Sequence, residues 1–280
     1  MTLGGLALAG GLVLSQNTLQ AEEEAKVEPK VNPGVKVTSM HKDAVPGLPS
    51  KVNYLLVGAG TAAFSAFRAI KAADPKAKVL IIGSEPRAPY MRPPLSKEMW
   101  FDPDVDKDSL RFKQWSGKQR SLYYEPNAFY TPHEKLETLE NGGIALVKGR
   151  KVVKIDADKQ VATLDNGNTV EYDKCLLATG GTPRNIGVLD SNPLVRSFTT
   201  TYRSVDDFFK LRELLPSMRT IGIVGGGFLG SELACSPGNY ARKNGLDLKV
   251  IQMYPEAGNM AKVTDCVPHL LLLISLRKNY

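Results

Sequence analysis

Two glycine clusters have the spacing of loops that bind dinucleotide phosphates. They are Gly58, Gly60 and Ala63 in one cluster, and Gly225, Gly227 and Gly230 in the other. In this pattern the first glycine permits a tight turn, the second lets backbone approach a pyrophosphate, and the third small residue lets the next helix pack closely. The N–H groups at the start of that helix attract the phosphates. Each cluster therefore predicts a phosphate-binding loop, and the alternative is a glycine turn that binds nothing.

An acidic residue follows each cluster where ribose recognition requires one. Glu85 lies 22 residues after Ala63, just beyond an apolar run, and Glu256 follows the corresponding run after the second cluster. A carboxylate at this place accepts hydrogen bonds from ribose hydroxyl groups. It also repels a ribose 2′-phosphate, and no arginine lies near Glu256 in the sequence, so we expect NAD rather than NADP there.

The elements that position these residues alternate between strands and helices. Residues 52–58 and 78–83 are apolar runs typical of buried strands, and residues 61–74 between them have the apolar face of a helix. A strand, a helix and a strand in this order form a right-handed unit of a parallel sheet. A second such unit is predicted at 220–254. The fold class is therefore α/β, with doubly wound, Rossmann-like dinucleotide-binding domains.

Further strand candidates lie between the two units, at 144–149, 151–157 and 160–181. The residues Asp165–Asn168 in the last run are a strong hairpin-turn signal. We expect these strands to form an antiparallel excursion that returns to the main sheet at 174–180. In the second unit, Pro237 lies inside the expected helix, where proline costs ~3 kcal/mol or more, so a kink or break is predicted.

Composition restricts the class of protein. The chain has 280 residues, of which 42% are hydrophobic and 23% charged, as is ordinary for globular proteins. Its three cysteines form no C-x-x-C pair, which argues against a disulfide framework, a zinc ribbon and a dithiol-disulfide reductase. The histidines have no metal-ligand spacing, so no metal is predicted. The net charge of +7 indicates either a solvated basic surface suited to anionic cofactors or attraction to nucleic acid or an anionic membrane.

The N-terminal part differs in composition from the rest. Residues 1–20 are apolar and glycine-rich, and no Lys or Arg precedes Lys26, so the basic start of a signal peptide is missing. This segment is either part of a membrane segment or a secretory apolar region, and poor import into an organelle is expected from Met1. Residues 21–50 are charged, contain four prolines and lack aromatic residues, which is typical of a flexible tether.

Three segments carry a family resemblance. They read PYMRPPLSKEMW at 89–100, RFKQWSGKQRS at 111–121 and GGGFLGSELA at 225–234. With the hairpin and strand at 165–180, they resemble the apoptosis-inducing-factor family of two-dinucleotide flavoproteins, over about residues 52–263. The resemblance implies FAD/NAD(P)-binding Rossmann-like domains, with FAD in the first and NAD in the second. It implies an FAD-dependent NADH oxidoreductase in which hydride passes from NADH to the flavin.

The resemblance also assigns site residues. The FAD-contacting positions are Gly58, Ala59, Gly60, Thr61, Ala62, Glu85, Arg92, Lys97, Val152 and Arg203, and the NAD-contacting positions are Phe228, Leu229, Glu256 and Lys262 with the loop glycines. Lys97 and Glu232 are paired beside the flavin ring and are the catalytic candidates, while Trp115 stacks on the nicotinamide nucleotide. Physically, Arg92 in a proline-fixed loop can neutralise a pyrophosphate.

Each of these assignments has an alternative. Arg92 and Lys97 could instead be solvated loop charges. Trp115 lies among basic residues that could form a nucleic-acid patch. These neighbours are Arg111, Lys113, Lys118 and Arg120.

Location and partners follow from the resemblance alone. It implies the mitochondrial intermembrane space, a tether to the inner membrane, and a disulfide-relay import oxidoreductase as partner in respiratory-chain assembly. It further implies programmed cell death with a nuclear role and non-specific DNA binding, and a homodimer formed on reduction of full-length members. The alternative functions are a ferredoxin-reductase-like electron-transfer enzyme, a redox-responsive interaction protein and a basic chromatin-binding effector.

The expected domain organisation combines these observations. It comprises an apolar segment at 1–20, a linker at 21–50, a partial FAD-binding domain at 51–181, a partial NAD-binding domain at 182–263 and a divergent tail at 264–280. Residues after Val263 resemble nothing in the family, so the fold is expected to be C-terminally incomplete. Weak FAD retention and no competent oxidoreductase activity are expected of this chain by itself.

Overall fold

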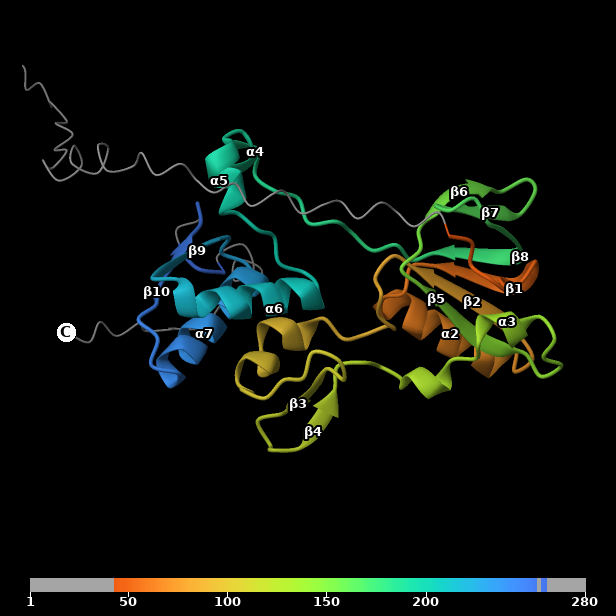
Figure 1. Cartoon of the computed structure of the whole chain (residues 1–280), viewed down its shortest axis with the longest axis horizontal. Coiled ribbons are helices and arrows are strands. Elements are labelled where there is room, and N and C mark those ends of the chain that lie inside the picture. The colour runs from red at the N-terminus through yellow and green to blue at the C-terminus, as the bar shows by residue number, and fades with distance from the viewer. Residues whose placement is uncertain (1–42, 256–257, 261–280) are drawn as a thin grey trace, which may run out of the picture. The chain divides into compact units, whose positions relative to one another are not determined.

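A six-stranded sheet forms the first unit of the computed structural model, which describes residues 43–255 and 258–260 (Figure 1). Its strand order is β5-β2-β1-β8-β7-β6. The strands are β1 Lys51–Val57, β2 Lys78–Gly83, β5 Gly143–Lys148, β6 Val152–Asp156, β7 Val161–Leu164 and β8 Thr169–Leu177. Strands β5, β2, β1 and β8 pair in parallel, while β8, β7 and β6 pair in antiparallel fashion. The α/β fold class is confirmed.

The antiparallel excursion is smaller than the sequence predicts. The segment 144–149 was assigned to it, but β5 pairs in parallel with β2 at the edge of the main sheet. The apolar run in β5 is buried along most of its length, as is typical of strands covered on both faces. Such a run identifies a buried strand but carries no information on its partner or direction, which explains this error.

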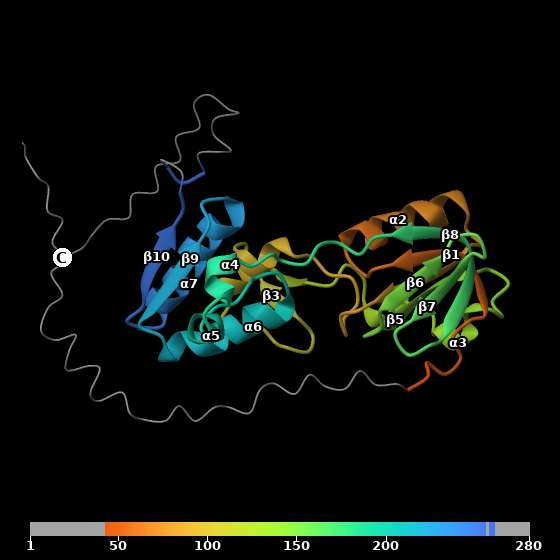
Figure 2. The same cartoon turned by 90° about the horizontal axis from the view of Figure 1, so that it is seen from above.

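The two faces of the sheet bury alternate residues of its central strands. Leu55, Val57 and Ile82 face one core, which also contains Leu136 of the short helix α3 His133–Leu136. Leu56, Val79 and Ile81 face the other, where they pack against Ala63 and Phe67 of the helix α2 Thr61–Ala73. Figure 2 shows α2 lying along one face of the sheet. The start of α2 is thereby fixed at the carboxyl end of β1.

The second unit contains two parallel strands and two longer helices. They are β9 Thr220–Val224, β10 Lys249–Met253, α6 Val205–Leu214 and α7 Phe228–Lys243. Helix α7 connects β9 to β10, so this unit also has the predicted order of strand, helix and strand. The short helices α4 Gly187–Asp190 and α5 Pro193–Ser197 precede it and contain no buried residue.

A third core joins the second unit to the loop-rich segment that follows β2. That segment contains the 3-10 helices η1 Pro93–Ser96, η2 Glu98–Trp100 and η3 Asn127–Phe129 and the hairpin strands β3 Arg111–Lys113 and β4 Gln119–Ser121, and a further 3-10 helix, η4 Leu215–Ser217, follows α6. Trp100, Leu110 and Phe112 are fully buried together with Phe208 of α6. The proline-rich loop is therefore held by a hydrophobic core.

The helix α7 runs without a break across Pro237, so the predicted break does not occur, while the predicted kink stays a prediction. Pro237 is buried, and Leu233 and Ala241 are buried on the same helix. Tyr240 and the segment that follows the helix pack against the third core. Tertiary burial of this kind stabilises a helix more than local propensity does, and it offsets the local cost of the proline.

The last residues of the expected linker contact the first unit. Val45 and Leu48 pack against the core that contains Leu55. The Val45 amide donates to the Asn168 side chain at 2.9 Å, and the Ser50 hydroxyl donates to Glu137 at 2.5 Å. Residues within the expected tether at 21–50 therefore contact the first unit. Residues 1–42 and 264–280, with the apolar segment and the tail, lie outside the described residues.

Two half-buried tyrosines should respond in opposite ways to removal of the hydroxyl. The Tyr130 hydroxyl is buried without a hydrogen-bond partner among the described residues, whereas the Tyr202 hydroxyl donates to the Leu95 carbonyl. Burial raises the pKa of both groups, so both remain protonated at neutral pH. We expect Tyr130→Phe to raise the free energy of unfolding by about 1 kcal/mol and Tyr202→Phe to lower it by a similar amount. Urea denaturation of both variants checks this, and a larger loss in Tyr130→Phe would contradict it.

Candidate functional site

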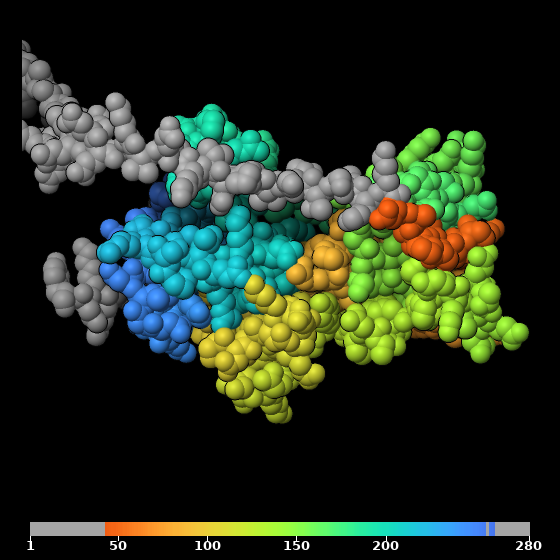
Figure 3. Space-filling model, in the orientation of Figure 1, coloured from red at the N-terminus to blue at the C-terminus, as the bar shows by residue number. Residues whose placement is uncertain are grey.

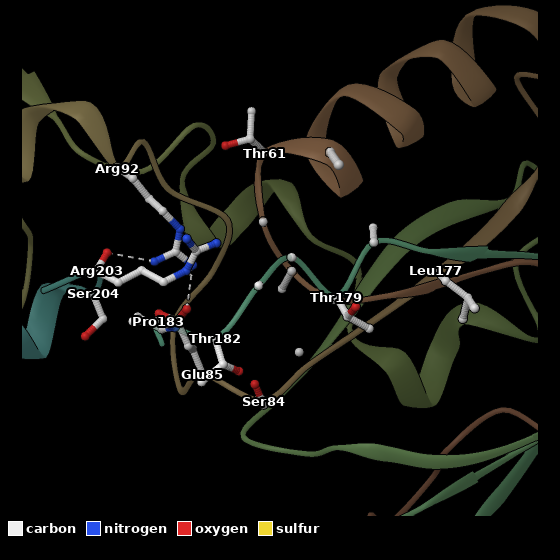
Figure 4. A pocket seen from close by; sticks show the side chains of 18 of the residues that line it. Thr61, Ser84, Glu85, Arg92, Leu177, Thr179, Thr182, Pro183, Arg203 and Ser204 are labelled. Carbon is white, nitrogen blue, oxygen red and sulfur yellow. Dashed lines mark hydrogen bonds and ion pairs between the residues drawn. The ribbon is translucent and has the colours of Figure 1, made fainter. Parts of the chain in front are cut away.

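A pocket of about 660 Å³ lies where the first glycine loop, the end of β2 and the segment before α6 meet (Figure 4). The residues that line it are Gly58, Ala59, Gly60, Thr61, Ala62, Gly83, Ser84, Glu85, Arg92, Leu177, Ala178, Thr179, Gly180, Gly181, Thr182, Pro183, Thr201, Arg203, Ser204 and Asp207. Eight of the ten predicted FAD-contacting positions are among them. The pocket lies beyond the carboxyl ends of β1, β2 and β8, the usual ligand position in parallel α/β sheets.

The two glycines of the first loop meet different steric requirements. Gly58 has a φ of +110°, and a Cβ there would lie 2.2 Å from the Ala178 carbonyl oxygen. Gly60 has an extended backbone, and a Cβ there would meet nothing within 4 Å. No side chain caps the start of α2, so its first N–H groups face the space beside Gly60. Gly58 is thus required by the fold, whereas the space at Gly60 is available for a phosphate.

Two guanidinium groups lie next to one another across the pocket from Thr61, as Figure 4 shows for Arg92 and Arg203. Arg92 donates to a Glu85 carboxylate oxygen at 2.7 Å and to the Arg203 carbonyl at 3.0 Å. Among residues 43–255 and 258–260, Glu85 is the only carboxylate whose bond to one of these two guanidinium groups is seen. The arrangement suits a diphosphate, which guanidinium groups bind through charge-assisted hydrogen bonds.

A helix cap holds Arg203 in place. Asp207 accepts hydrogen bonds from the backbone amides of Arg203 at 2.9 Å and Ser204 at 2.7 Å. In return, the Ser204 hydroxyl accepts from the Asp207 amide at 3.3 Å. This reciprocal capping box fixes the start of α6, and with it the backbone from which Arg203 extends.

Electrostatics in the pocket favour a charged Arg92 and a protonated Tyr90. Burial, and then the hydrogen bond to Glu85, raises the pKa of Tyr90 well above its ordinary value. Burial lowers the pKa of Arg92, but the hydrogen bond to Glu85 and the nearby Tyr90 outweigh it, so the net pKa is raised. Both groups therefore remain hydrogen-bond donors throughout the neutral pH range.

The structure brings together the two catalytic candidates, which lie outside the pocket lining. The Lys97 ammonium lies 2.8 Å from a Glu232 carboxylate oxygen, and the Ser96 hydroxyl also bonds to Glu232. Ser236 donates to the Ser96 carbonyl at 2.7 Å, which ties the 3-10 helix η1 to α7. The Lys97 side chain is 42% exposed and that of Glu232 is 28% exposed, so both are accessible to a ligand.

The second glycine loop has the same strand-loop-helix geometry as the first. Gly225 has a φ of +138°, and a Cβ at Gly230 would lie 2.2 Å from the Gly225 carbonyl oxygen. A Cβ at Gly227 would meet nothing within 4 Å. Phe228 and Leu229, at the start of α7, are 63% and 46% exposed. Glu256 and Lys262 lie outside the described residues.

Like Lys97, the predicted cofactor-binding residues Val152 and Trp115 do not line the pocket. Val152 starts β6 and packs against the core that contains Leu55. Trp115 lies in the β3–β4 hairpin, which reaches the surface in the space-filling view (Figure 3), and its side chain is 93% exposed. Arg111, Lys113, Lys118 and Arg120 are also exposed there. Both proposed uses of Trp115, nucleotide stacking and nucleic-acid contact, require this exposure.

Several pocket residues were not predicted as site residues. The segment 180–183 and the residues Thr201, Ser204 and Asp207 come from the chain after β8. The signal for Ser204 and Asp207 was available, because Ser-x-x-Asp before an amphipathic run is a capping-box pattern. Ser84, next to Glu85, was also detectable as a polar residue at the end of a buried strand.

The pocket fits the adenosine diphosphate part of a dinucleotide. It offers a free helix N-terminus, an open glycine, two guanidinium groups and a carboxylate for ribose hydroxyls. No aromatic side chain is among the residues that line it. In the described part of the chain, no group of three His, Cys, Asp or Glu residues could hold a metal ion, and no helix is long and apolar enough to cross a membrane.

Two known proteins are similar to this chain over most of its length. Over 220 residues, 77% of the chain, it is 51% identical to the putative mitochondrial apoptosis-inducing factor 1 of Drosophila melanogaster. It is 38% identical over 208 residues, 73% of the chain, to mitochondrial apoptosis-inducing factor 1 of Dictyostelium discoideum. The chain covers 30% and 36% of these two proteins, so it spans about a third of their length.

Solved structures and a family profile agree on the fold. A ferredoxin reductase from Rhodopseudomonas palustris aligns with a TM-score of 0.55 and 26% identity, covering 74% of this chain and 43% of that one. Putidaredoxin reductase in its covalent complex with putidaredoxin aligns with a TM-score of 0.54 and 21% identity, covering 72% of this chain and 49% of that one, which supports the fold. Residues 52–267 match the profile of the pyridine nucleotide-disulphide oxidoreductases. The chain therefore belongs to the pyridine nucleotide-disulphide oxidoreductase family.

Proposed function

We propose that the chain is part of an FAD-dependent NADH oxidoreductase of the apoptosis-inducing-factor type. The observation that carries this proposal is the pocket in which Gly60, Glu85, Arg92 and Arg203 converge at the start of α2. Arg92 and Arg203 would hold the pyrophosphate of FAD, and Glu85 would accept from its ribose. The second glycine loop would hold NADH in the same manner.

Bound FAD would supply the redox chemistry by accepting a hydride equivalent from NADH. The chain's own residues bind and orient the two cofactors. Lys97, the residue after η1, forms an ion pair with Glu232 of α7, and the N-terminus of α7 follows the second glycine loop. We propose that this pair positions the two loops and contributes charge near the flavin ring.

Titration of the 280-residue chain with FAD tests the proposal. Saturable quenching of flavin fluorescence, competed by ADP, is expected because the pocket fits the adenosine diphosphate part. Arg92→Gln should weaken FAD binding by about 10-fold, since it removes one charge-assisted contact. Lys135→Gln, which removes an exposed charge on α3, is the matched control. Unsaturable binding, or equal affinities of the two variants, would contradict the assignment.

The donor preference is expected to be NADH over NADPH. Glu256 follows β10, and its carboxylate would repel a ribose 2′-phosphate. We expect the chain to bind NADH about 10-fold more tightly than NADPH, and Glu256→Gln to bring the two affinities within about threefold. Nicotinamide fluorescence titrations measure both. A preference for NADPH, or an unchanged ratio in Glu256→Gln, would show that Glu256 has no such role.

A ferredoxin-reductase-like electron-transfer enzyme is the second candidate function. It is supported by the aligned ferredoxin reductase and by 30% identity over 202 residues to a rhodocoxin reductase of Rhodococcus erythropolis, of which this chain covers 40%. Both functions use the same FAD and NADH sites and differ in the electron acceptor. Reduction of a ferredoxin by the complete protein would favour this second candidate.

Location and macromolecular partners are also part of the proposal. The names of two relatives include the word mitochondrial, which supports a mitochondrial location for this chain. We propose the finer assignments from the family resemblance: the intermembrane space, inner-membrane association, a disulfide-relay partner and a nuclear role in cell death. The four exposed cations of the β3–β4 hairpin support non-specific DNA binding, which should weaken steeply with added salt.

A further inference from the structure

Both carboxylate oxygens of Glu85 are already engaged. Arg92 donates to one oxygen at 2.7 Å, and the Tyr90 hydroxyl donates to the other at 2.6 Å. Arg92 also donates to the Tyr90 hydroxyl oxygen at 3.0 Å, so the three groups close a ring of hydrogen bonds. A carboxylate has about four lone-pair sites, so Glu85 keeps acceptor capacity in the directions that these two donors leave open.

The backbone and a buried core hold Tyr90 in this position. Its residue is only 4% exposed and packs in the third core. Backbone hydrogen bonds join its neighbours to the segment after β4: the Met91 amide donates to Leu122 at 3.0 Å and the Tyr124 amide donates to Pro89 at 3.1 Å. The hydroxyl therefore approaches Glu85 from a fixed direction, whereas Glu85 itself is one-third exposed at its side chain.

We propose that Tyr90 is a positioning residue that sets the ribose specificity of the nucleotide site by fixing the orientation of the Glu85 carboxylate. This inference rests on the proposed function of the pocket and adds a residue to it that the glycine-and-acid pattern does not include. Arg92 by itself cannot fix the carboxylate, because it also bonds to the Arg203 carbonyl and faces the space for a diphosphate. The tyrosine contact occupies one oxygen on its protein side and directs the remaining lone pairs into the pocket.

The high pKa of Tyr90 is consistent with this role. Burial and the hydrogen bond to Glu85 raise the pKa of the Tyr90 hydroxyl, so the hydroxyl stays protonated near neutral pH and can donate to Glu85. A tyrosine with only a packing role would need its ring and not its hydroxyl. The two roles are therefore separated by a substitution that removes the oxygen atom alone.

The experiment compares ADP with 2′-deoxy-ADP on the full 280-residue chain by isothermal titration calorimetry. We expect the wild-type chain to bind ADP about 10-fold more tightly, because a hydroxyl donating to a charged carboxylate contributes this much. In Tyr90→Phe the ratio should fall to about threefold or less, while binding of 2′-deoxy-ADP changes little. The control is Tyr123→Phe, since Tyr123 packs against the same core but is not a hydrogen-bond partner of Glu85, and its ratio should stay at the wild-type value.

A second pair of variants shows whether the hydroxyl acts through the carboxylate. In a Glu85→Gln background, adding Tyr90→Phe should leave the ADP to 2′-deoxy-ADP ratio unchanged. This pair also answers the question if Tyr90→Phe alone does not fold, because the double variant has no charged carboxylate oxygen that lacks the tyrosine donor. If the ADP to 2′-deoxy-ADP ratio differs between Glu85→Gln and the double variant with Tyr90→Phe, the proposal is wrong.

Two further outcomes separate failure of this inference from failure of the proposed function. If the wild-type chain discriminates between the two nucleotides and Tyr90→Phe discriminates equally well, Tyr90 has only a packing role and this inference is wrong while the nucleotide site stands. If the wild-type chain binds neither ADP nor FAD, the proposed function fails and this inference fails with it.

Discussion

Replacing Gly58 by alanine should abolish FAD binding and lower the free energy of unfolding by about 3 kcal/mol or more. The backbone at Gly58 has a φ of +110°, which side chains rarely adopt, and the new Cβ would lie 2.2 Å from the Ala178 carbonyl oxygen. That oxygen belongs to the turn after β8, which itself lines the pocket. Relief of the clash must therefore move β1 away from β8, the pair that forms the centre of the sheet. Urea denaturation and FAD titration measure the two effects.

Gly60→Ala is the matched control, because the same methyl group is added two residues later. No atom lies within 4 Å of a Cβ at Gly60, and its φ of −104° is ordinary for alanine. We expect the free energy of unfolding to change by less than about 0.5 kcal/mol. FAD affinity should nevertheless fall by about 10-fold or more, because the methyl group occupies the space that a pyrophosphate approaches. Unchanged FAD affinity in Gly60→Ala would show that the diphosphate does not lie against this loop.

The contrast between these glycines shows what the sequence could predict about the site. The spacing of Gly58, Gly60 and Ala63 between an apolar run and a helical pattern is a local signal, and it located the start of α2 correctly. The position of Glu85 followed from the same unit, since it comes directly after β2. A pattern of this kind specifies the backbone at the end of a strand, and that backbone determines most of the phosphate site.

The parts that sequence could not predict depend on long-range packing. The segment 144–149 was identified as a strand, but its parallel partner β2 lies 65 residues earlier and no local feature names it. The hydroxyl of Tyr90 was not singled out because tyrosines in loops are common and its contact with Glu85 depends on the fold of the proline-rich segment. The sequence predicted that Pro237 would destabilise the helix locally. The helix nevertheless continues across Pro237, because tertiary burial outweighs that local cost.

Trp100→Ala should destabilise the chain by about 3–5 kcal/mol, a large share of the ~5–15 kcal/mol that stabilises a domain. The Trp100 residue is 1% exposed, and its ring lies 5.1 Å from Phe208 and 5.9 Å from Tyr240 in edge-to-face contacts. Its indole N–H donates to the Leu95 carbonyl at 2.8 Å. Because these partners belong to the η1 segment, α6 and α7, truncation leaves a cavity where three segments meet. The loss should also separate Lys97 from Glu232, since η1 and α7 would no longer share a rigid core.

The second tryptophan provides the control for this prediction. Trp115 is 93% exposed, so Trp115→Ala should change the free energy of unfolding by less than about 0.5 kcal/mol. If Trp115 stacks on the nicotinamide nucleotide, the same variant should bind NADH about 10-fold more weakly, since such contacts contribute on the order of 1–3 kcal/mol. Urea denaturation followed by far-UV circular dichroism compares both variants without relying on the fluorophore that each one lacks. Equal stabilities of Trp100→Ala and Trp115→Ala would mean that the third core does not hold the loop-rich segment to α6 and α7, and the positioning of Lys97 against Glu232 would then need another cause.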